Sequence, residues 1–123
     1  MKRKILVIDD NPHILEAIEL VLDTEGYTVK TVTKSEGVED EIHTYQPDLI
    51  LLDLLLSGRN GEEITKILKS DSSTKNIPII IISAHPTAEK TAKSAGADGF
   101  IAKPFDISDL LSQIEKLLKP PSK

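Results

Sequence analysis

The sequence contains no cysteine and no tryptophan, and aromatic residues make up only 3% of its 123 positions. Without cysteine, the chain can form neither a disulfide framework nor a thiol nucleophile. No apolar run approaches the ~20 residues that a membrane-spanning helix needs. The basic N-terminus is followed by only four apolar residues before the first aspartate, too few for the core of a signal peptide. We therefore expect a cytoplasmic protein that does not contact a membrane.

Acidic side chains outnumber basic ones by 20 to 15, so the formal net charge is −5. Residues 1–63 carry 14 acidic and 6 basic side chains, whereas residues 64–123 carry 6 acidic and 9 basic ones. A protein that binds nucleic acid needs a dense basic face. The excess of basic over acidic side chains in residues 64–123 is too small to provide one. We expect no direct binding to nucleic acid. The length and the 39% apolar content fit one globular domain with a core of its own.

Short apolar runs alternate along the chain with amphipathic segments, which predicts five strands and five helices. The strands are expected at residues 4–9, 27–32, 48–53, 77–83 and 99–103, and the helices at 12–25, 35–44, 61–70, 86–96 and 106–118. Strands that are apolar on both faces are typical of a parallel sheet covered by helices. The fold class is therefore α/β: a doubly wound five-stranded parallel sheet of order 2-1-3-4-5, a flavodoxin-like (βα)5 three-layer sandwich.

Polar residues follow the ends of four predicted strands. Asp9 and Asp10 end the first strand, Asp53 the third and Ser83 the fourth, and Lys103 comes at the end of the fifth. In such a sheet these ends lie at one edge, where ligands bind. Three neighbouring carboxylates need a cation or bound protons, and an oxygen-rich open site suits Mg²⁺ (or Mn²⁺) together with phosphate oxygens. The lysine and the hydroxyl would hold the other oxygens of a phosphoryl group.

Each of these residues has an ordinary interpretation when taken alone. Asp9 and Asp10 could cap the following helix, Asp53 could be a loop carboxylate, and Lys103 could be a solvated surface lysine. Ser83 is a common type of residue at a strand end. The ordered set of five, each after the appropriate strand, favours a site.

With these motifs the chain resembles a response-regulator receiver domain of two-component signal transduction. The matching signatures are Asp9-Asp10, Asp53, Gly61 at the start of the third helix, Ser83-Ala84, Phe100 and Lys103-Pro104. The resemblance covers nearly the whole chain, with a receiver domain over residues 1–119 and a tail or the start of a linker over 120–123. It implies a phosphoprotein that acts as a switch in a two-component system or phosphorelay. It would catalyse only its own phosphorylation and dephosphorylation.

The resemblance also implies a role for each matching residue. Asp53 would accept the phosphoryl group from a phosphohistidine of a histidine kinase or phosphotransfer protein, and we expect its side chain to be exposed at the sheet edge, where the phosphoryl group can reach it. Asp10, Asp53 and the main-chain carbonyl of Leu55 would ligate Mg²⁺, with Asp9 acting largely through water. Lys103 would pair with the phosphoryl group, whose oxygens Ser83 and the backbone amide of Ala84 would bond.

Further implied roles concern lifetime and output. Leu55 and His85 would flank the path of the hydrolytic water, and the Lys103-Pro104 peptide bond would be cis. Ser83 and Phe100 would act as the switch that reshapes the face formed by the fourth helix, fifth strand and fifth helix, where a downstream protein target would dock. The role of Phe100 as a simple core residue remains open.

The sequence departs from the common receiver pattern at three positions. Ser57 stands where a proline is usual, Ser83 where a threonine is more frequent, and Phe100 lacks the hydroxyl of the more usual tyrosine.

Three other functions remain as alternatives. A phosphatase with an aspartate nucleophile usually has a second carboxylate at the position of Leu55, and a flavodoxin-like cofactor binder would need a less acidic loop after the first strand. A docking module that works without phosphorylation is the third.

Overall fold

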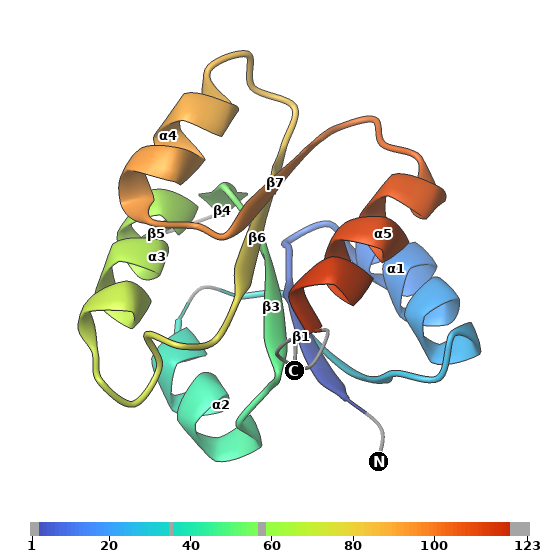
Figure 1. Cartoon of the computed structure of the whole chain (residues 1–123), viewed down its shortest axis with the longest axis horizontal. Helices are drawn as coiled ribbons and strands as arrows, with labels where there is room; N and C mark the ends of the chain where they lie inside the picture. The colour runs from blue at the N-terminus through green and yellow to red at the C-terminus, as the bar shows by residue number, and fades with distance from the viewer. Residues whose placement is uncertain (1–2, 35, 57–58, 119–123) are drawn as a thin grey trace, which may run out of the picture.

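The computed structural model describes residues 3–34, 36–56 and 59–118, apart from the side chain of Arg59. It contains five longer strands and five helices in alternation, with a small hairpin between the third strand and the third helix (Figure 1). In chain order these are β1 (Lys4–Ile8), α1 (Pro12–Thr24), β2 (Thr28–Val32), α2 (Val38–Tyr45), β3 (Leu49–Asp53), β4 (Leu55–Leu56), β5 (Arg59–Asn60), α3 (Gly61–Ser70), β6 (Ile79–Ser83), α4 (Ala88–Ala95), β7 (Gly99–Ala102) and α5 (Ile107–Leu118).

The main sheet has the order β2-β1-β3-β6-β7, and every neighbouring pair is parallel. This confirms the predicted fold class and strand order, since β6 and β7 are the fourth and fifth strands of the sheet. The three most apolar runs are the three central strands, and β3 and β6 are buried along their whole length. The edge strands β2 and β7 are only partly buried.

Helices cover both faces of the sheet. In Figure 1, α1 and α5 lie on one side of the strands and α2, α3 and α4 on the other. Because successive side chains of a strand point to opposite faces, alternate residues of each central strand enter two separate cores. Ile80 and Ile82 of β6 pack with α1 and α5, whereas Ile79 and Ile81 pack with α2, α3 and α4. This is the expected three-layer sandwich.

Two local features differ from the sequence prediction. The second helix begins at Val38 rather than at residue 35, because Gly37 precedes it in a left-handed conformation, with φ of +77°. The segment after β3 was expected to be a loop, but Leu55 and Leu56 pair with Asn60 and Arg59 in an antiparallel hairpin. Two-residue strands are too short to leave a periodic pattern in the sequence.

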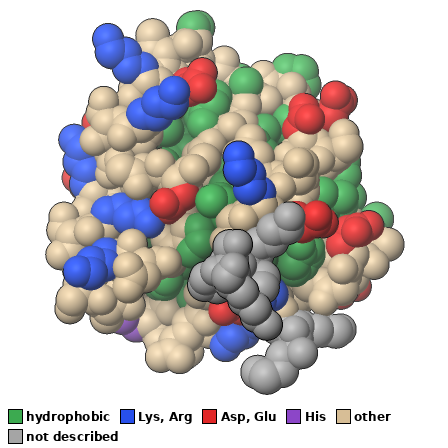
Figure 2. All heavy atoms as spheres, viewed as in Figure 1, with side chains coloured by type: hydrophobic (Ala, Val, Ile, Leu, Met, Phe, Trp, Pro, Cys, Tyr) green, Lys and Arg blue, Asp and Glu red, His purple; other side chains and the backbone are tan. Residues whose placement is uncertain are grey.

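Charged side chains are distributed unevenly over the surface. In the view of Figure 2, Lys and Arg gather on the side of α3 and α4, and most Asp and Glu on the side of α1 and α5. Several of the lysines have acidic partners, as in the pairs Lys66–Glu62 and Lys93–Glu89 within single helices. None of the described helices is both long enough and apolar enough to span a bilayer.

Candidate phosphoryl-acceptor site

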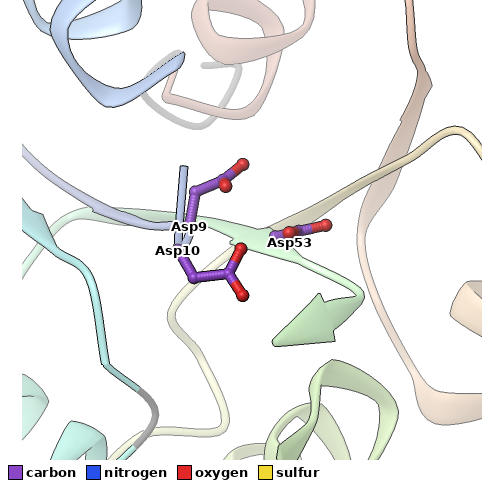
Figure 3. Close-up of side chains that lie close together, drawn as sticks. All are labelled: Asp9, Asp10 and Asp53. Atoms are coloured by element: carbon purple, nitrogen blue, oxygen red, sulfur yellow. The ribbon is translucent and has the colours of Figure 1, made fainter. Parts of the chain in front are cut away.

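The strand register brings three carboxylates together at the carboxyl end of the sheet. Ile8 of β1 lies beside Leu52 of β3, so the next residues, Asp9 and Asp53, emerge from neighbouring strands. Asp10 follows Asp9, and Figure 3 shows all three side chains around the ends of these strands. One carboxylate oxygen of each lies within 4.8 Å of the others. The sequence prediction that these three residues would meet is confirmed.

Asp9 is buried, with 2% of its surface exposed, and contacts are formed by both of its oxygens. Its Oδ1 accepts a hydrogen bond from the backbone N–H of Asn11 at 2.9 Å, and its Oδ2 lies 3.3 Å from Nζ of Lys103. The side chain of Asn11 in turn caps α1 by accepting from the N–H groups of His13 and Ile14. Asp9 therefore connects the start of α1 to Lys103.

Lys103 stands between two of the carboxylates. Its Nζ is 3.3 Å from Asp9 and 3.8 Å from Oδ1 of Asp53, and its side chain is only 21% exposed. The backbone N–H of Lys103 donates to the carbonyl of Ser83 at 2.9 Å, which holds the end of β7 against β6. The Lys103-Pro104 peptide bond is cis, as expected. The closer contact with Asp9 was missed in the sequence analysis, because residue types at strand ends do not determine such distances.

Asp53 is buried, with 7% of its surface exposed. The expectation that it would be exposed at the sheet edge was wrong. Burial, followed by the charge of Asp9, raises the pKa of Asp53 from 3.8 to about 6. Lys103 and the backbone N–H of Leu55, which lies 3.4 Å from Oδ1, act in the opposite direction without cancelling that rise.

Ser83 ends β6 beside this cluster and is 2% exposed. Its Oγ accepts a hydrogen bond from the backbone N–H of His85 at 3.1 Å. The Oγ–H bond itself can rotate, so the hydroxyl keeps a proton to donate. Ala84 and His85 follow in the exposed loop, and Nδ1 of His85 accepts from the N–H of Thr87. The structure brings Ser83 to the expected strand end, and the predicted roles of Ala84 and His85 stay predictions.

The two remaining predicted positions are in the hairpin after β3 and in β7. Leu55, in the hairpin two residues after Asp53, is 59% exposed. Phe100 lies in β7 beside Ile81 of β6, is half-buried and packs against the core under α2, α3 and α4. It also lines a groove between β7 and α5 with Phe105 and Gln113. Ser57, the position of the usual proline, lies outside the described residues.

The donor set of the cluster fits a divalent cation that prefers oxygen ligands. Asp9 and Asp53 share the ammonium of Lys103, Asp10 adds a third carboxylate within 4.8 Å, and burial together with the charge of Asp9 raises the pKa of Asp53. Asp10 is exposed at the rim, where a cation with several bound waters can reach it. The chemistry of these residues therefore suits Mg²⁺ or Mn²⁺.

The sequence matches the model of the response regulator receiver domain over residues 5–115. The chain belongs to this family. Among curated proteins, this receiver domain is 31% identical to the DNA-binding response regulator MtrA of Mycolicibacterium smegmatis and 32% identical to the phosphate regulon transcriptional regulatory protein PhoB of Escherichia coli. Both matches cover 97% of the chain, but 52% of MtrA and 53% of PhoB. The chain thus spans about half the length of these relatives.

Solved structures of receiver domains superpose closely. A putative response regulator from Chloroflexus aurantiacus has a TM-score of 0.91 and 29% identity, covering 96% of this chain and 98% of its own. The chemotaxis response regulator CheY4 of Vibrio cholerae has a TM-score of 0.87 and 27% identity, covering 96% of this chain and 100% of its own. The receiver domain is thus a module of two-component response regulators, and the family supports a signalling switch over the phosphatase, cofactor-binding and docking-module alternatives.

Proposed function

We propose that Asp53 accepts a phosphoryl group from the phosphohistidine of a histidine kinase or phosphotransfer protein. The observation that carries this proposal is the buried carboxylate of Asp53, which lies close to Asp9 and Asp10 and 3.8 Å from the ammonium of Lys103. A buried acidic group with a raised pKa and specific charged neighbours is typical of a functional site. The charge of an ordinary structural carboxylate would be balanced by a neighbouring cationic side chain or by hydrogen-bond donors.

In the proposed reaction, a carboxylate oxygen of Asp53 attacks phosphorus, the new O–P bond forms and the N–P bond to the imidazole breaks. The leaving imidazole takes a proton from solvent. Charge spreads over the three equatorial oxygens during transfer, so the protein contributes positioning and electrostatic stabilisation. Nζ of Lys103 lies close enough to pair with one of these oxygens, and the hydroxyl of Ser83 donates to another. Hydrolysis by water then breaks the O–P bond, releasing inorganic phosphate and restoring the carboxylate.

We infer that Asp10, Asp53 and the carbonyl of Leu55 hold Mg²⁺ and that Asp9 contacts it through water. The contacts of Asp9 support its indirect role, because its two oxygens already meet the N–H of Asn11 and Nζ of Lys103. When bound, the cation supplies positive charge that offsets the negative charge of the carboxylates and of the incoming phosphoryl oxygens.

Phosphorylation is proposed to shift the balance between two conformations. Ser83 would move toward the phosphoryl group and Phe100 would turn inward, changing the face of α4, β7 and α5 where a downstream protein binds. The half-buried position of Phe100 beside the groove between β7 and α5 supports this route. Tuning of hydrolysis by Leu55 and His85, the cytoplasmic location, the lack of nucleic-acid binding by this chain, and the boundary at residues 119–120 stay predictions.

The decisive experiment is phosphorylation by a small molecule in place of the kinase. The protein is incubated with Mg²⁺ and acetyl phosphate or phosphoramidate, and intact mass spectrometry records the added phosphoryl group. We expect one adduct on the parent, none after removal of Mg²⁺ by a chelator, and none on Asp53→Asn. An adduct of equal yield on Asp53→Asn would refute the assignment of the acceptor.

The matched control is Asp48→Asn, which removes an aspartate at the opposite end of β3. It should be phosphorylated like the parent. Titration with Mg²⁺, followed by NMR, tests the metal site separately. Asp10→Ala should weaken the affinity for Mg²⁺, and an unchanged affinity would contradict the proposed ligand set.

A further inference from the structure

The backbone of Gly61 lies close to that of the acceptor segment, Asp53 to Leu55. It is the first residue of α3, and its N–H donates to the carbonyl of Leu54 at 2.7 Å. A Cβ atom at this position would lie 2.6 Å from the carbonyl oxygen of Asp53 and 2.9 Å from Cα of Leu54. Both neighbours are backbone atoms, which cannot rotate away as the end of a side chain can.

The need for glycine here is one of space rather than conformation. The glycines with positive φ in the described chain are Gly26, Gly37 and Gly96, and Gly61 is not among them. An alanine at position 61 could therefore adopt the local backbone angles, but it would require the start of α3 and the end of β3 to separate.

Neither of these two elements can move freely. The N–H of Leu54 donates to the carbonyl of Ile82 in β6 at 3.1 Å, and the side chain of Leu54 is only 5% exposed. On the other side, Ile64 and Leu68 anchor α3 in the core, with 0% and 2% of their surfaces exposed. Leu54 is thus held by β6 on one side and by α3 on the other.

We propose that Gly61 is a positioning residue for the phosphoryl-acceptor site, because its missing side chain lets α3 fix the backbone from Asp53 to Leu55. This inference rests on the proposed function. The fixed segment includes the carboxylate that would accept the phosphoryl group and the Leu55 carbonyl that would bind Mg²⁺. Since Leu54 lies between them, its two backbone hydrogen bonds control the spacing of both groups.

The test compares Gly61→Ala with Gly26→Ala, each in the full chain. Gly26 has φ of +93° at the end of α1, and a Cβ there would have no neighbour within 4 Å. Gly26→Ala therefore destabilises the fold through backbone conformation, at the end of the sheet opposite the site. It controls for the loss of stability that Gly61→Ala also causes. Circular dichroism first establishes conditions in which both variants are folded.

We expect Gly61→Ala to weaken Mg²⁺ binding, measured by NMR titration, and to slow adduct formation from acetyl phosphate, each by about tenfold or more. Gly26→Ala should keep both values within about twofold of the parent, because it is remote from the site. A folded Gly61→Ala variant with the affinity and rate of the parent would overturn the inference. A parent that neither binds Mg²⁺ nor forms an adduct on Asp53 would instead refute the proposed function, and this inference with it.

A second measurement on the parent covers the case in which Gly61→Ala does not fold. In amide spectra, the Gly61 signal should shift during Mg²⁺ titration with the same midpoint as those of Leu54 and Leu55. This follows from the 2.7 Å hydrogen bond between Gly61 and Leu54. The signals of Gly26 and Gly96 should stay in place. A stationary Gly61 signal alongside a shifting Leu55 signal would contradict the proposed coupling.

Discussion

Aspartates lie at both ends of the parallel sheet, but the two ends use them differently. At the amino end, Asp48 accepts the backbone N–H of Lys4 at 2.7 Å, and Asp98 accepts that of Ile79 at 2.9 Å. Nζ of Lys69 completes this arrangement by donating to Asp98 at 2.7 Å and to the carbonyls of Lys75 and Ile77. Each carboxylate there holds the start of a strand.

At the carboxyl end, Asp9 and Asp53 share the ammonium of Lys103, and Asp10 lies beside them. The pKa of Asp53 rises to about 6, chiefly because the group is buried and lies near Asp9. The comparison separates two uses of the same residue type. Carboxylates that accept a backbone N–H at the start of a strand stabilise the fold, whereas two buried carboxylates that share one ammonium leave a site that a cation and a phosphoryl group can complete.

The largest expected effect comes from removing the ammonium at the carboxyl end. Lys103→Met should slow adduct formation from acetyl phosphate by about a hundredfold, because it removes the positive charge closest to the developing phosphoryl oxygens. The rate is measured by intact mass at fixed Mg²⁺ concentration. The matched control is Lys69→Met, which removes the corresponding lysine at the amino end and should leave the rate unchanged. Equal rates for Lys103→Met and the parent would contradict the role of Lys103.

The second prediction concerns stability at the carboxyl end. In the absence of Mg²⁺ at pH 7.5, Asp53→Asn should raise the free energy of unfolding by about 2 kcal/mol, because it removes a buried charge while keeping the shape of the side chain. Denaturant unfolding measures the difference. The control Asp48→Asn should instead lower stability, since the carboxylate of Asp48 accepts the N–H of Lys4.

This gain in stability should depend on pH with a defined sign. The folded pKa of Asp53, about 6, lies above the ordinary value of 3.8, so the folded state binds the proton more tightly. The contribution of Asp53 to stability therefore falls as pH rises from about 4 to about 6 and is constant above that range. The difference in the free energy of unfolding between Asp53→Asn and the parent should increase over this pH interval. A difference that is the same at pH 4 and pH 7.5 would contradict the raised pKa.

The third prediction uses the same titration to test the metal site. Because Mg²⁺ and a proton compete for the carboxylate of Asp53, the apparent affinity for Mg²⁺ should fall by about tenfold per pH unit below a pH of about 6. It should be nearly independent of pH between 7 and 8. NMR titrations at several pH values measure it. An affinity that does not change between pH 7 and pH 5 would exclude Asp53 as a direct ligand.

Much of this architecture could be predicted from the sequence, because the apolar runs of β1, β3 and β6 are long and uninterrupted. Once those strands are parallel, Asp9, Asp53 and Ser83 must lie at one edge. Contacts that depend on exact distances could not be predicted. The proximity of Lys103 to Asp9 depends on how β7 lies against β6 beyond Ser83, and no residue pattern encodes it.

The burial of Asp53 was also beyond prediction from the sequence. Its position at a strand end suggested exposure, but the burial of a strand end depends on the packing around it in three dimensions, which no residue pattern encodes. The hairpin of β4 and β5 is set by pairing between Leu55 and Asn60 rather than by periodicity. Gly61 could be recognised as a motif glycine, whereas the reason for it, contact with the backbone of Asp53, appears only in three dimensions.

The smallest expected effect concerns the amino end of the sheet. There, Lys69→Met removes the ammonium that donates to Asp98 and to two backbone carbonyls. The side chain of Lys69 is 18% exposed and makes three hydrogen bonds, so its loss should lower the free energy of unfolding by about 1–2 kcal/mol. Denaturant unfolding measures this change, and the affinity for Mg²⁺ should equal that of the parent. The exposed pair Lys66–Glu62 offers a control, because Lys66→Met should change stability by less than about 0.5 kcal/mol. If Lys69→Met weakened Mg²⁺ binding, the two ends of the sheet would be coupled, and their separation into a stabilising end and a functional end would fail.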